Sequence, residues 1–168
     1  EVQFYVASRG HHEDVGGLAP GSMTPLATTI EEEGVVIDTF KLVEDGVFRE
    51  TAVRQLLTSA KYPARKPDKN IADLKAQVAA NARGAAEIRQ MIAHFGLDVV
   101  QAYMGHVKDN GEETVRRLIS RLTDGQFRIA TDQGTEVCVT ITVDHATRSA
   151  RIDFTGTSAA QPNNFNAP

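Results

Sequence analysis

The sequence predicts an α+β fold, with β-strands and hairpins at both ends and a long helical hairpin between them. Three observations support this class: β-branched runs bounded by turn residues early in the chain, apolar residues at helical spacing in the middle, and strict apolar alternation near the end. We expect residues 1–168 to be part of a single domain, itself an excerpt of a larger α+β domain. Its predicted segments are strand and loop over 1–48, helix over 49–122 and β-structure over 126–155.

The first third of the chain predicts strands joined by a glycine-rich loop. The apolar run Val2–Ala7 predicts a strand. Residues 10–25 hold two prolines and four glycines, which disfavour regular helix. Residues 34–43 are rich in β-branched and aromatic residues and lead to Asp45-Gly46, a strong signal for a hairpin turn.

The middle of the chain predicts a short helix over 50–60, followed by two long ones. Asn70 is a suitable N-cap with Asp73 as its capping partner, and the apolar stripe that follows ends before Gly96, a typical helix-terminating glycine. The second long helix is predicted over 98–122, and Asn110-Gly111 is expected to be either a weak point or a short break in it. We expect these two helices to pack as an antiparallel pair.

The last third returns to β-structure. Apolar side chains alternate with Cys138 and two threonines, which is the pattern of a half-buried strand, and residues 150–154 form the returning strand. The alternating apolar residues are Val137, Val139, Ile141 and Val143.

Composition excludes several classes of protein. No run approaches the roughly 18 apolar residues of a membrane span, and one cysteine cannot form an intrachain disulfide. The net charge of −4, without a block of Lys or Arg, argues against a nucleic-acid partner. These features predict a cytoplasmic protein.

The densest group of candidate functional residues is Arg9 to Asp14. Imidazole and carboxylate groups are ligands for divalent transition metals, so His11, His12 and Asp14 are candidate ligands within four positions. Adjacent side chains of an extended chain point to opposite faces, so one imidazole can face a site while the other supports it or acts as a general base. The alternative is a surface turn whose histidines have no function.

Other candidates carry weaker signals. Asp73, Gln77 and Asn81 lie four apart and could reach a shared polar partner, although capping and exposed hydrogen bonding explain them better. Cys138 is expected to be a quiet, partly buried thiol. The sequence has no P-loop, no dinucleotide-binding glycine motif at a strand-to-helix junction and no serine nucleophile elbow.

Several segments resemble the hydantoinase B/oxoprolinase family. Residues 7–17 (Ala-Ser-Arg-Gly-His-His-Glu-Asp-Val-Gly-Gly) and 20–25 are similar to its signature. Residues 70–81, together with Tyr103-Met104-Gly105-His106, resemble the ATP-hydrolysing 5-oxoprolinases in particular, and residues 153–158 match a further family segment.

The resemblance implies the hydrolytic, B-type half of an ATP-dependent cyclic-amide hydrolase that opens 5-oxo-L-proline to L-glutamate, a step of glutathione metabolism. It implies a divalent metal ion in this half, with ATP and Mg²⁺ bound by a different, hydantoinase A-type half or subunit that phosphorylates the substrate. It also implies a homo-oligomer. Alternatives are the B subunit of an N-methylhydantoinase or related ATP-dependent carboxylase, or a non-catalytic subunit-assembly domain formed by residues 70–122.

The resemblance also implies residue roles. His11 is the best candidate metal ligand, with His12 and Asp14 as further ligands or catalytic groups, and Arg9 is a candidate for binding a substrate carboxylate or phosphate. The family's other ligand-bearing segments precede the position matched by Glu1, so we expect residues 1–168 alone to be inactive.

Overall fold

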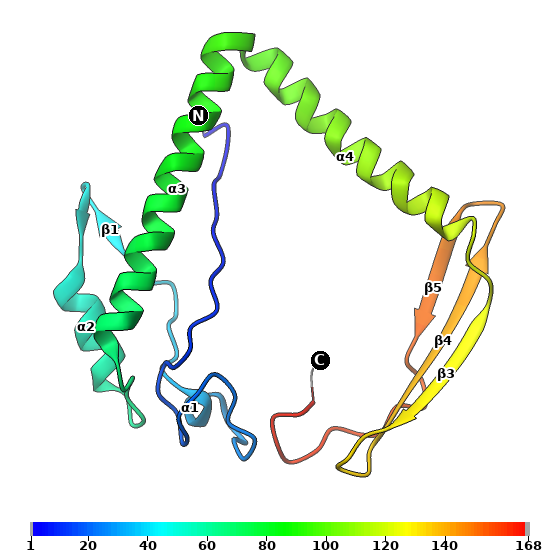
Figure 1. Ribbon diagram of the computed structural model, residues 1–168, viewed down its shortest axis with the longest axis horizontal. Coiled ribbons are helices and arrows are strands. Elements are labelled where there is room, and N and C mark those ends of the chain that lie inside the picture. Colours follow the sequence, from blue (N-terminus) through cyan, green and yellow to red (C-terminus); the bar gives the residue numbers. More distant parts are fainter. Residues whose placement is uncertain (1, 167–168) are drawn as a thin grey trace. The chain divides into compact units, whose positions relative to one another are not determined.

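The computed structural model describes residues 2–166 and shows an α+β architecture (Figure 1). The chain forms two compact units, one of residues up to Arg89 together with 161–166, and one of residues Gln90–Ala160. The first unit contains the predicted site, and the second contains the three-stranded sheet.

The first unit begins with loops and ends in a long helix. A hairpin of β1 (Val43–Glu44) and β2 (Val47–Phe48) turns at Asp45 and Gly46, both with positive φ, as the Asp-Gly signal predicted. The other elements of this unit are α1 (Ile30–Glu33), α2 (Glu50–Ser59) and most of α3 (Pro67–Phe95), whose residues from Gln90 onward belong to the second unit.

A small hydrophobic core joins α2 to the start of α3. Val53 and Leu57 on α2 pack with Ala64 in the connection and Ile71 on α3, and each of the four is less than 7% exposed. This core fixes the first turns of α3 relative to α2. The partly buried residues Phe40, Leu42, Phe48 and Leu74 surround it.

The strand predicted over Val2–Ala7 is absent, and this prediction was wrong. The segment is extended but lies along α3, where a Cβ added to Gly84 would meet the Val6 side chain at 2.8 Å and Ser8 Oγ donates to the Gln77 carbonyl oxygen at 3.3 Å (Figure 1). A helix has no free backbone groups along its side, so the extended segment gains contacts there but no β-ladder.

Helix α3 begins at Pro67, so the prediction that Asn70 caps it was wrong. Proline is favoured at the first helical position because its missing N–H would have no helical partner. Asn70 therefore lies inside the first turn, where its backbone N–H donates to the Lys66 carbonyl oxygen at 3.3 Å. Its side chain is consequently free to contact another segment.

Helix α4 (Leu97–Ile119) runs without a break through Asn110-Gly111, so of the two alternatives predicted there the short break is wrong. One internal glycine costs only about 1 kcal/mol, and the following turn carries ion pairs at i,i+4 spacing between Glu112 and Arg116 and between Glu113 and Arg117. Gly96 joins α3 to α4 with φ 88°, as expected for a helix-terminating glycine. Antiparallel packing of these helices stays a prediction.

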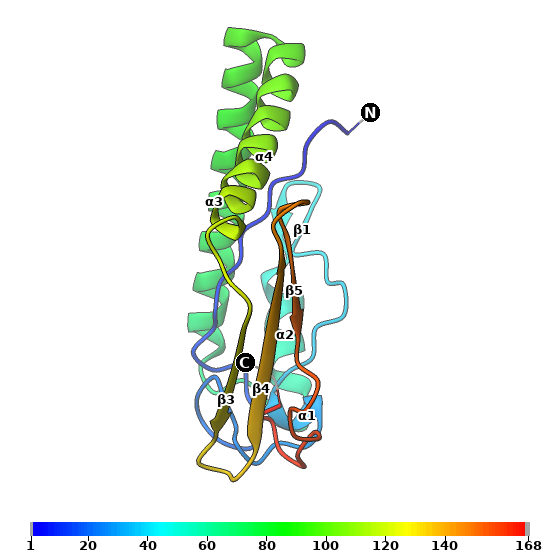
Figure 2. The same ribbon diagram turned by 90° about the vertical axis from the view of Figure 1, so that its right-hand side faces the viewer.

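The second unit contains the antiparallel sheet β3 (Gly125–Ala130), β4 (Glu136–Asp144) and β5 (Ser149–Asp153), with β4 in the centre (Figure 2). The alternation predicted for β4 is confirmed. Its apolar residues share one face with Phe127, Ile129 and Ile152, which are 52–60% exposed. The register pairs Phe127 with Val139, Ile129 with Val137 and Ile141 with Ile152.

Polar contacts connect α4 to the β4–β5 turn within this unit. Arg116 Nη1 donates to the carbonyl oxygens of Thr147 and Arg148 at 3.1 and 3.3 Å, and Arg148 Nη1 pairs with Glu113 at 3.0 Å.

Among residues 2–166, no helix has the length and hydropathy needed to cross a membrane.

Shortening Leu57 to alanine should destabilise the protein strongly, because its side chain is 1% exposed and fills the core between α2 and α3. We expect Leu57→Ala to lower the free energy of unfolding by about 2–5 kcal/mol in urea titrations of the full-length protein. Leu26→Ala is the matched control, since Leu26 is 81% exposed, and it should change stability by less than about 0.5 kcal/mol. If Leu57→Ala and Leu26→Ala lower the free energy of unfolding equally, the assignment of Leu57 to a buried core is contradicted.

Candidate functional site

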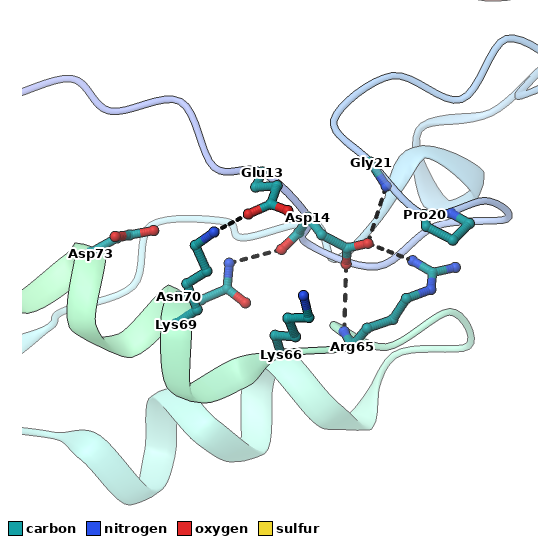
Figure 3. Close-up of a pocket in the computed structure, with 9 residues that line it drawn as sticks. All are labelled: Glu13, Asp14, Pro20, Gly21, Arg65, Lys66, Lys69, Asn70 and Asp73. Atoms are coloured by element: carbon teal, nitrogen blue, oxygen red, sulfur yellow. Dashed lines mark hydrogen bonds and ion pairs between the residues drawn. The ribbon is translucent and has the colours of Figure 1, made fainter.

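The carboxylate of Asp14 organises the glycine-rich loop. It accepts a hydrogen bond from the backbone N–H group of Gly16 at 2.9 Å. It also accepts hydrogen bonds from the backbone N–H group of Gly21 at 3.2 Å and from Arg65 Nη1 at 2.9 Å, as Figure 3 shows. Arg65 Nη2 also donates to the Gly17 carbonyl oxygen at 2.7 Å. One buried carboxylate therefore ties both ends of the loop to the segment before α3.

These contacts also determine the charge of Asp14. Burial opposes ionisation and is the largest single influence on the Asp14 pKa, but the donors of Gly16, Gly21 and Arg65 together outweigh it and lower the pKa. The side chain is only 13% exposed. Asp14 is thus an ionised, fully hydrogen-bonded group at neutral pH.

Two buried glycines allow the loop to pass close to neighbouring backbone. Gly16 has φ 99°, and a Cβ there would lie 2.1 Å from the Tyr62 carbonyl oxygen. Gly17 has φ 93°, and a Cβ there would lie 2.5 Å from the Glu33 carbonyl oxygen. Only glycine satisfies both the positive φ and the close approach at these positions.

The first turns of α3 hold the segment before this loop. Lys69 forms an ion pair with Glu13, and Asn70 Nδ2 donates to the Asp14 carbonyl oxygen at 2.8 Å (Figure 3). The same Nδ2 lies 3.3 Å from His12 Nδ1. His12 therefore faces α3, and its side chain is 18% exposed.

The polar stripe of α3 continues along the same segment. Asp73 Oδ2 lies 3.6 Å from His12 Nδ1, and a Cβ added to Gly10 would meet Gln77 Nε2 at 2.1 Å. Asn81 Oδ1 is buried and has no hydrogen-bond partner among residues 2–166. Asp73 and Gln77 thus do lie against a shared partner, residues 8–12. This outcome favours the first of the two predicted alternatives over capping and exposed hydrogen bonding.

A small cleft of about 120 Å³ lies where the loop meets the start of α3. Three basic and three acidic residues line it, so charges of both signs surround a space large enough for a few water molecules or a small polar group. The lining residues are Glu13, Asp14, Pro20, Gly21, Arg65, Lys66, Lys69, Asn70 and Asp73 (Figure 3).

The predicted site residues differ in their surroundings. His12 and Asp14 contact α3 and the segment before it, whereas His11 and Arg9 are exposed and have no hydrogen bond or ion pair to residues 2–166. Within that range, no three His, Cys, Asp or Glu side chains are placed to hold a metal ion together. The metal-ligand assignment of His11, His12 and Asp14 stays a prediction.

Of these three predicted ligands, His11 is better suited to bind a metal ion than His12 or Asp14. The exposed imidazole of His11 has both ring nitrogens available. The Asp14 carboxylate does not fit, because four N–H contacts already occupy its oxygens. His12 Nδ1 already faces an amide donor.

Sequence reasoning missed the roles of Arg65, Lys69 and Asn70. The stretch before Asn70 has no periodicity, and each partner lies 48 or more positions away in the sequence. Proline is favoured at the first helical position, so Pro67 was a signal that α3 begins there. A start at Pro67 would have shown that Asn70 is not the N-cap.

The predicted quiet role of Cys138 agrees with its surroundings. The residue is 1% exposed, and the hydrogen bond from its Sγ to Glu136 raises the thiol pKa, as does burial. A raised pKa reduces the thiolate fraction, so Cys138 is unsuited to nucleophilic attack at neutral pH.

Comparison with known proteins identifies the family. The family model described as hydantoinase B/oxoprolinase matches residues 1–168. The chain belongs to the hydantoinase B/oxoprolinase family. It is 41% identical to 5-oxoprolinase of Dictyostelium discoideum and 40% identical to 5-oxoprolinase 1 of Arabidopsis thaliana, in both cases over 100% of the chain.

The chain is also similar to a protein of known structure. The chain resembles the crystal structure of ATP-dependent caprolactamase from Pseudomonas jessenii with a TM-score of 0.61 and 25% identity, over 83% of this chain and 24% of that one. The caprolactamase subunit beta of the same organism is 31% identical over 76% of the chain. The chain spans only 14–15% of the two 5-oxoprolinases.

Replacing Asp14 by asparagine should loosen the family's glycine-rich loop, because the amide loses the charge and presents N–H against existing donors. We expect Asp14→Asn to destabilise the full-length protein by about 1–3 kcal/mol at pH 7. The lowered Asp14 pKa means that this contribution is present above the unfolded-state value near pH 4 and disappears as pH falls through the folded value.

The measurement is chemical denaturation of wild type and variant between pH 3 and 7. The exposed Asp38, whose carboxylate accepts one hydrogen bond from residues 2–166, that of Thr39 Oγ1, is the control, and Asp38→Asn should have little effect. If the difference in free energy of unfolding between wild type and Asp14→Asn stays constant down to pH 3, the proposed role of the Asp14 charge is contradicted.

Proposed function

We propose that this chain is part of the hydrolytic, B-type half of an ATP-dependent cyclic-amide hydrolase that converts 5-oxo-L-proline to L-glutamate in the cytoplasm. The observation that carries the proposal is the match over the whole chain to 5-oxoprolinases at about 40% identity, compared with 31% over 76% of the chain for caprolactamase subunit beta.

The chemistry of the reaction defines what this part must supply. Opening a cyclic amide requires water to add to the carbonyl carbon, negative charge to develop on oxygen and a proton to reach the leaving nitrogen. The chain lacks a P-loop, which agrees with phosphoryl transfer from ATP in a separate A-type half. We therefore assign ATP and Mg²⁺ to that partner.

The loop of residues 9–14 is the candidate for this hydrolytic step. His12 is oriented by α3 and can hold or donate a proton near the reacting atoms, and exposed Arg9 can bind a carboxylate or phosphate oxygen. A divalent metal ion, held in part by His11, would polarise the amide oxygen or activate water. Asp14 acts in this proposal by fixing the loop.

The test of the proposed reaction uses the full-length protein with its A-type half. We expect glutamate release from 5-oxo-L-proline only when ATP is present, and much slower turnover of caprolactam and N-methylhydantoin. Preferential turnover of either of the other two amides would instead support the alternative hydantoinase or lactamase functions.

His11→Ala should abolish glutamate release and lower the amount of bound transition metal, because His11 is the exposed imidazole of the site. We expect a loss of at least about 100-fold in kcat, of the size typical when a group of the catalytic centre is removed. Glutamate assay and elemental analysis measure the two effects. His94→Ala alters an equally exposed histidine on α3 and should change neither; unchanged metal and turnover in His11→Ala would refute the assignment.

A role in subunit assembly is the second candidate function, and it is favoured by an apolar groove in the second unit. The groove has a volume of about 650 Å³ and is formed by the end of α3 and the start of α4. Its lining contains no charged side chain. The lining residues are Met91, Phe95, Val99, Val100, Tyr103, Met104 and Val107.

Placing a charge in this groove should weaken assembly if the groove contacts the A-type half or a second copy. We expect Val99→Asp or Val107→Asp to raise the dissociation constant of the full-length complex at least about 10-fold, since an unpaired charge would be buried. Lys108→Glu lies nine positions from Val99, on the opposite side of α4, and should have little effect. Sedimentation velocity measures association; unchanged association of both valine variants would exclude this role.

A further inference from the structure

The orientation of the Asn70 side-chain amide follows from one contact. Asn70 is 3% exposed, and its amide lies 2.8 Å from the Asp14 carbonyl oxygen. A carbonyl oxygen only accepts hydrogen bonds, so the NH₂ group of Asn70 must face it. The opposite assignment would bring two acceptor oxygens together in a buried place.

The same NH₂ group determines the state of His12. One hydrogen of Nδ2 is used by the Asp14 carbonyl oxygen, and the second is directed at His12 Nδ1, 3.3 Å away. Asp73 Oδ2, at 3.6 Å, is beyond hydrogen-bond distance from this nitrogen. Nδ1 therefore accepts a hydrogen bond, and a neutral imidazole that accepts at Nδ1 carries its proton on Nε2.

We propose that Asn70 is a positioning residue that holds His12 as the Nε2–H tautomer, so that His12 presents a hydrogen-bond donor to bound substrate and is not a metal ligand. This inference rests on the proposed function for the identity of the substrate. It divides the histidine pair by role: His11 is available to a metal ion, and His12 donates to an oxygen or to the leaving nitrogen of the amide.

The division follows from the chemistry of imidazole. A metal ion binds a ring nitrogen through its lone pair, and in the Nε2–H tautomer the only lone pair is at Nδ1. That lone pair is occupied by Asn70. The outward nitrogen of His12 can instead donate to a negatively charged or carbonyl oxygen, which is the group that develops charge during amide hydrolysis.

The unsatisfied oxygen of Asn70 supports a positioning role. Asn70 Oδ1 is buried and has no hydrogen-bond partner among the described residues. A buried amide whose oxygen is left unpaired destabilises the fold. The contacts that Asn70 does make are both through Nδ2, and one of them is to the candidate catalytic imidazole.

The first experiment compares substitutions at His12 that imitate one ring nitrogen each. The amide nitrogen of glutamine lies near the position of Nε2, whereas that of asparagine lies near Nδ1. In the full-length enzyme, we expect His12→Gln to keep at least 10-fold more kcat than His12→Asn. Both variants should retain the wild-type content of bound metal, whereas His11→Gln should lose it.

The second experiment removes the positioning group. Asn70→Ala should lower kcat 10-fold to 100-fold, with KM within about two-fold and metal content unchanged, because the hydrogen bond from Nε2 strengthens mainly as negative charge develops on the oxygen during the reaction. Asn81→Ala is the matched control, since Asn81 is also on α3 and also has a buried, unpartnered Oδ1. It should leave kcat within two-fold.

A crystal structure of the full-length protein provides a readout that does not depend on turnover or on folding of the variants. An acceptor atom within hydrogen-bond distance of His12 Nε2 supports the proposal, and a metal ion or an N–H donor at that nitrogen overturns it. Loss of metal in His12→Gln also overturns it. Absence of any cyclic-amide hydrolysis by the wild type refutes the proposed function, whereas the neighbour of Nε2 still decides the tautomer.

Discussion

The antiparallel contact between the extended N-terminal segment and α3 is the constraint on which the candidate site depends. The six steps of extended chain from Val6 to His12 span about 20 Å, and the fourteen steps along the helix from Asn70 to Gly84 span about 21 Å. Because the two lengths match, contacts at Gly84, Gln77 and Asn70 can form together without a bulge in either segment. The position of His12 is therefore fixed by all of these contacts together.

The Asp14 carboxylate extends this constraint into the loop. It follows directly after the last residues held by α3, and its contacts to Gly16, Gly21 and Arg65 set the direction in which the chain leaves the helix. A carboxylate used in this way is part of the scaffold. Its presence next to two histidines resembles a metal-binding motif in the sequence, and in this structure its oxygens accept hydrogen bonds from the loop and from Arg65.

The features that could be predicted from the sequence are those that depend on residues adjacent in the chain. The Asp45-Gly46 turn and the alternation in β4 follow from local backbone preferences and a two-residue period, and both are present. The strand predicted over Val2–Ala7 is absent because an apolar extended segment pairs as a strand only when another strand lies beside it. The roles of Arg65 and Asn70 were not predictable in the same way, because their partners are brought near by folding.

The histidine pair shows how the fold can separate two identical side chains. Neighbouring residues of an extended chain point in opposite directions, and α3 covers only one side of this segment. His12 faces the helix and receives a hydrogen bond that defines its tautomer, while His11 remains exposed. The resemblance to the family placed both imidazoles in one ligand set. The contact with α3 instead gives the oriented imidazole a fixed donor direction and leaves the exposed one free to bind an ion.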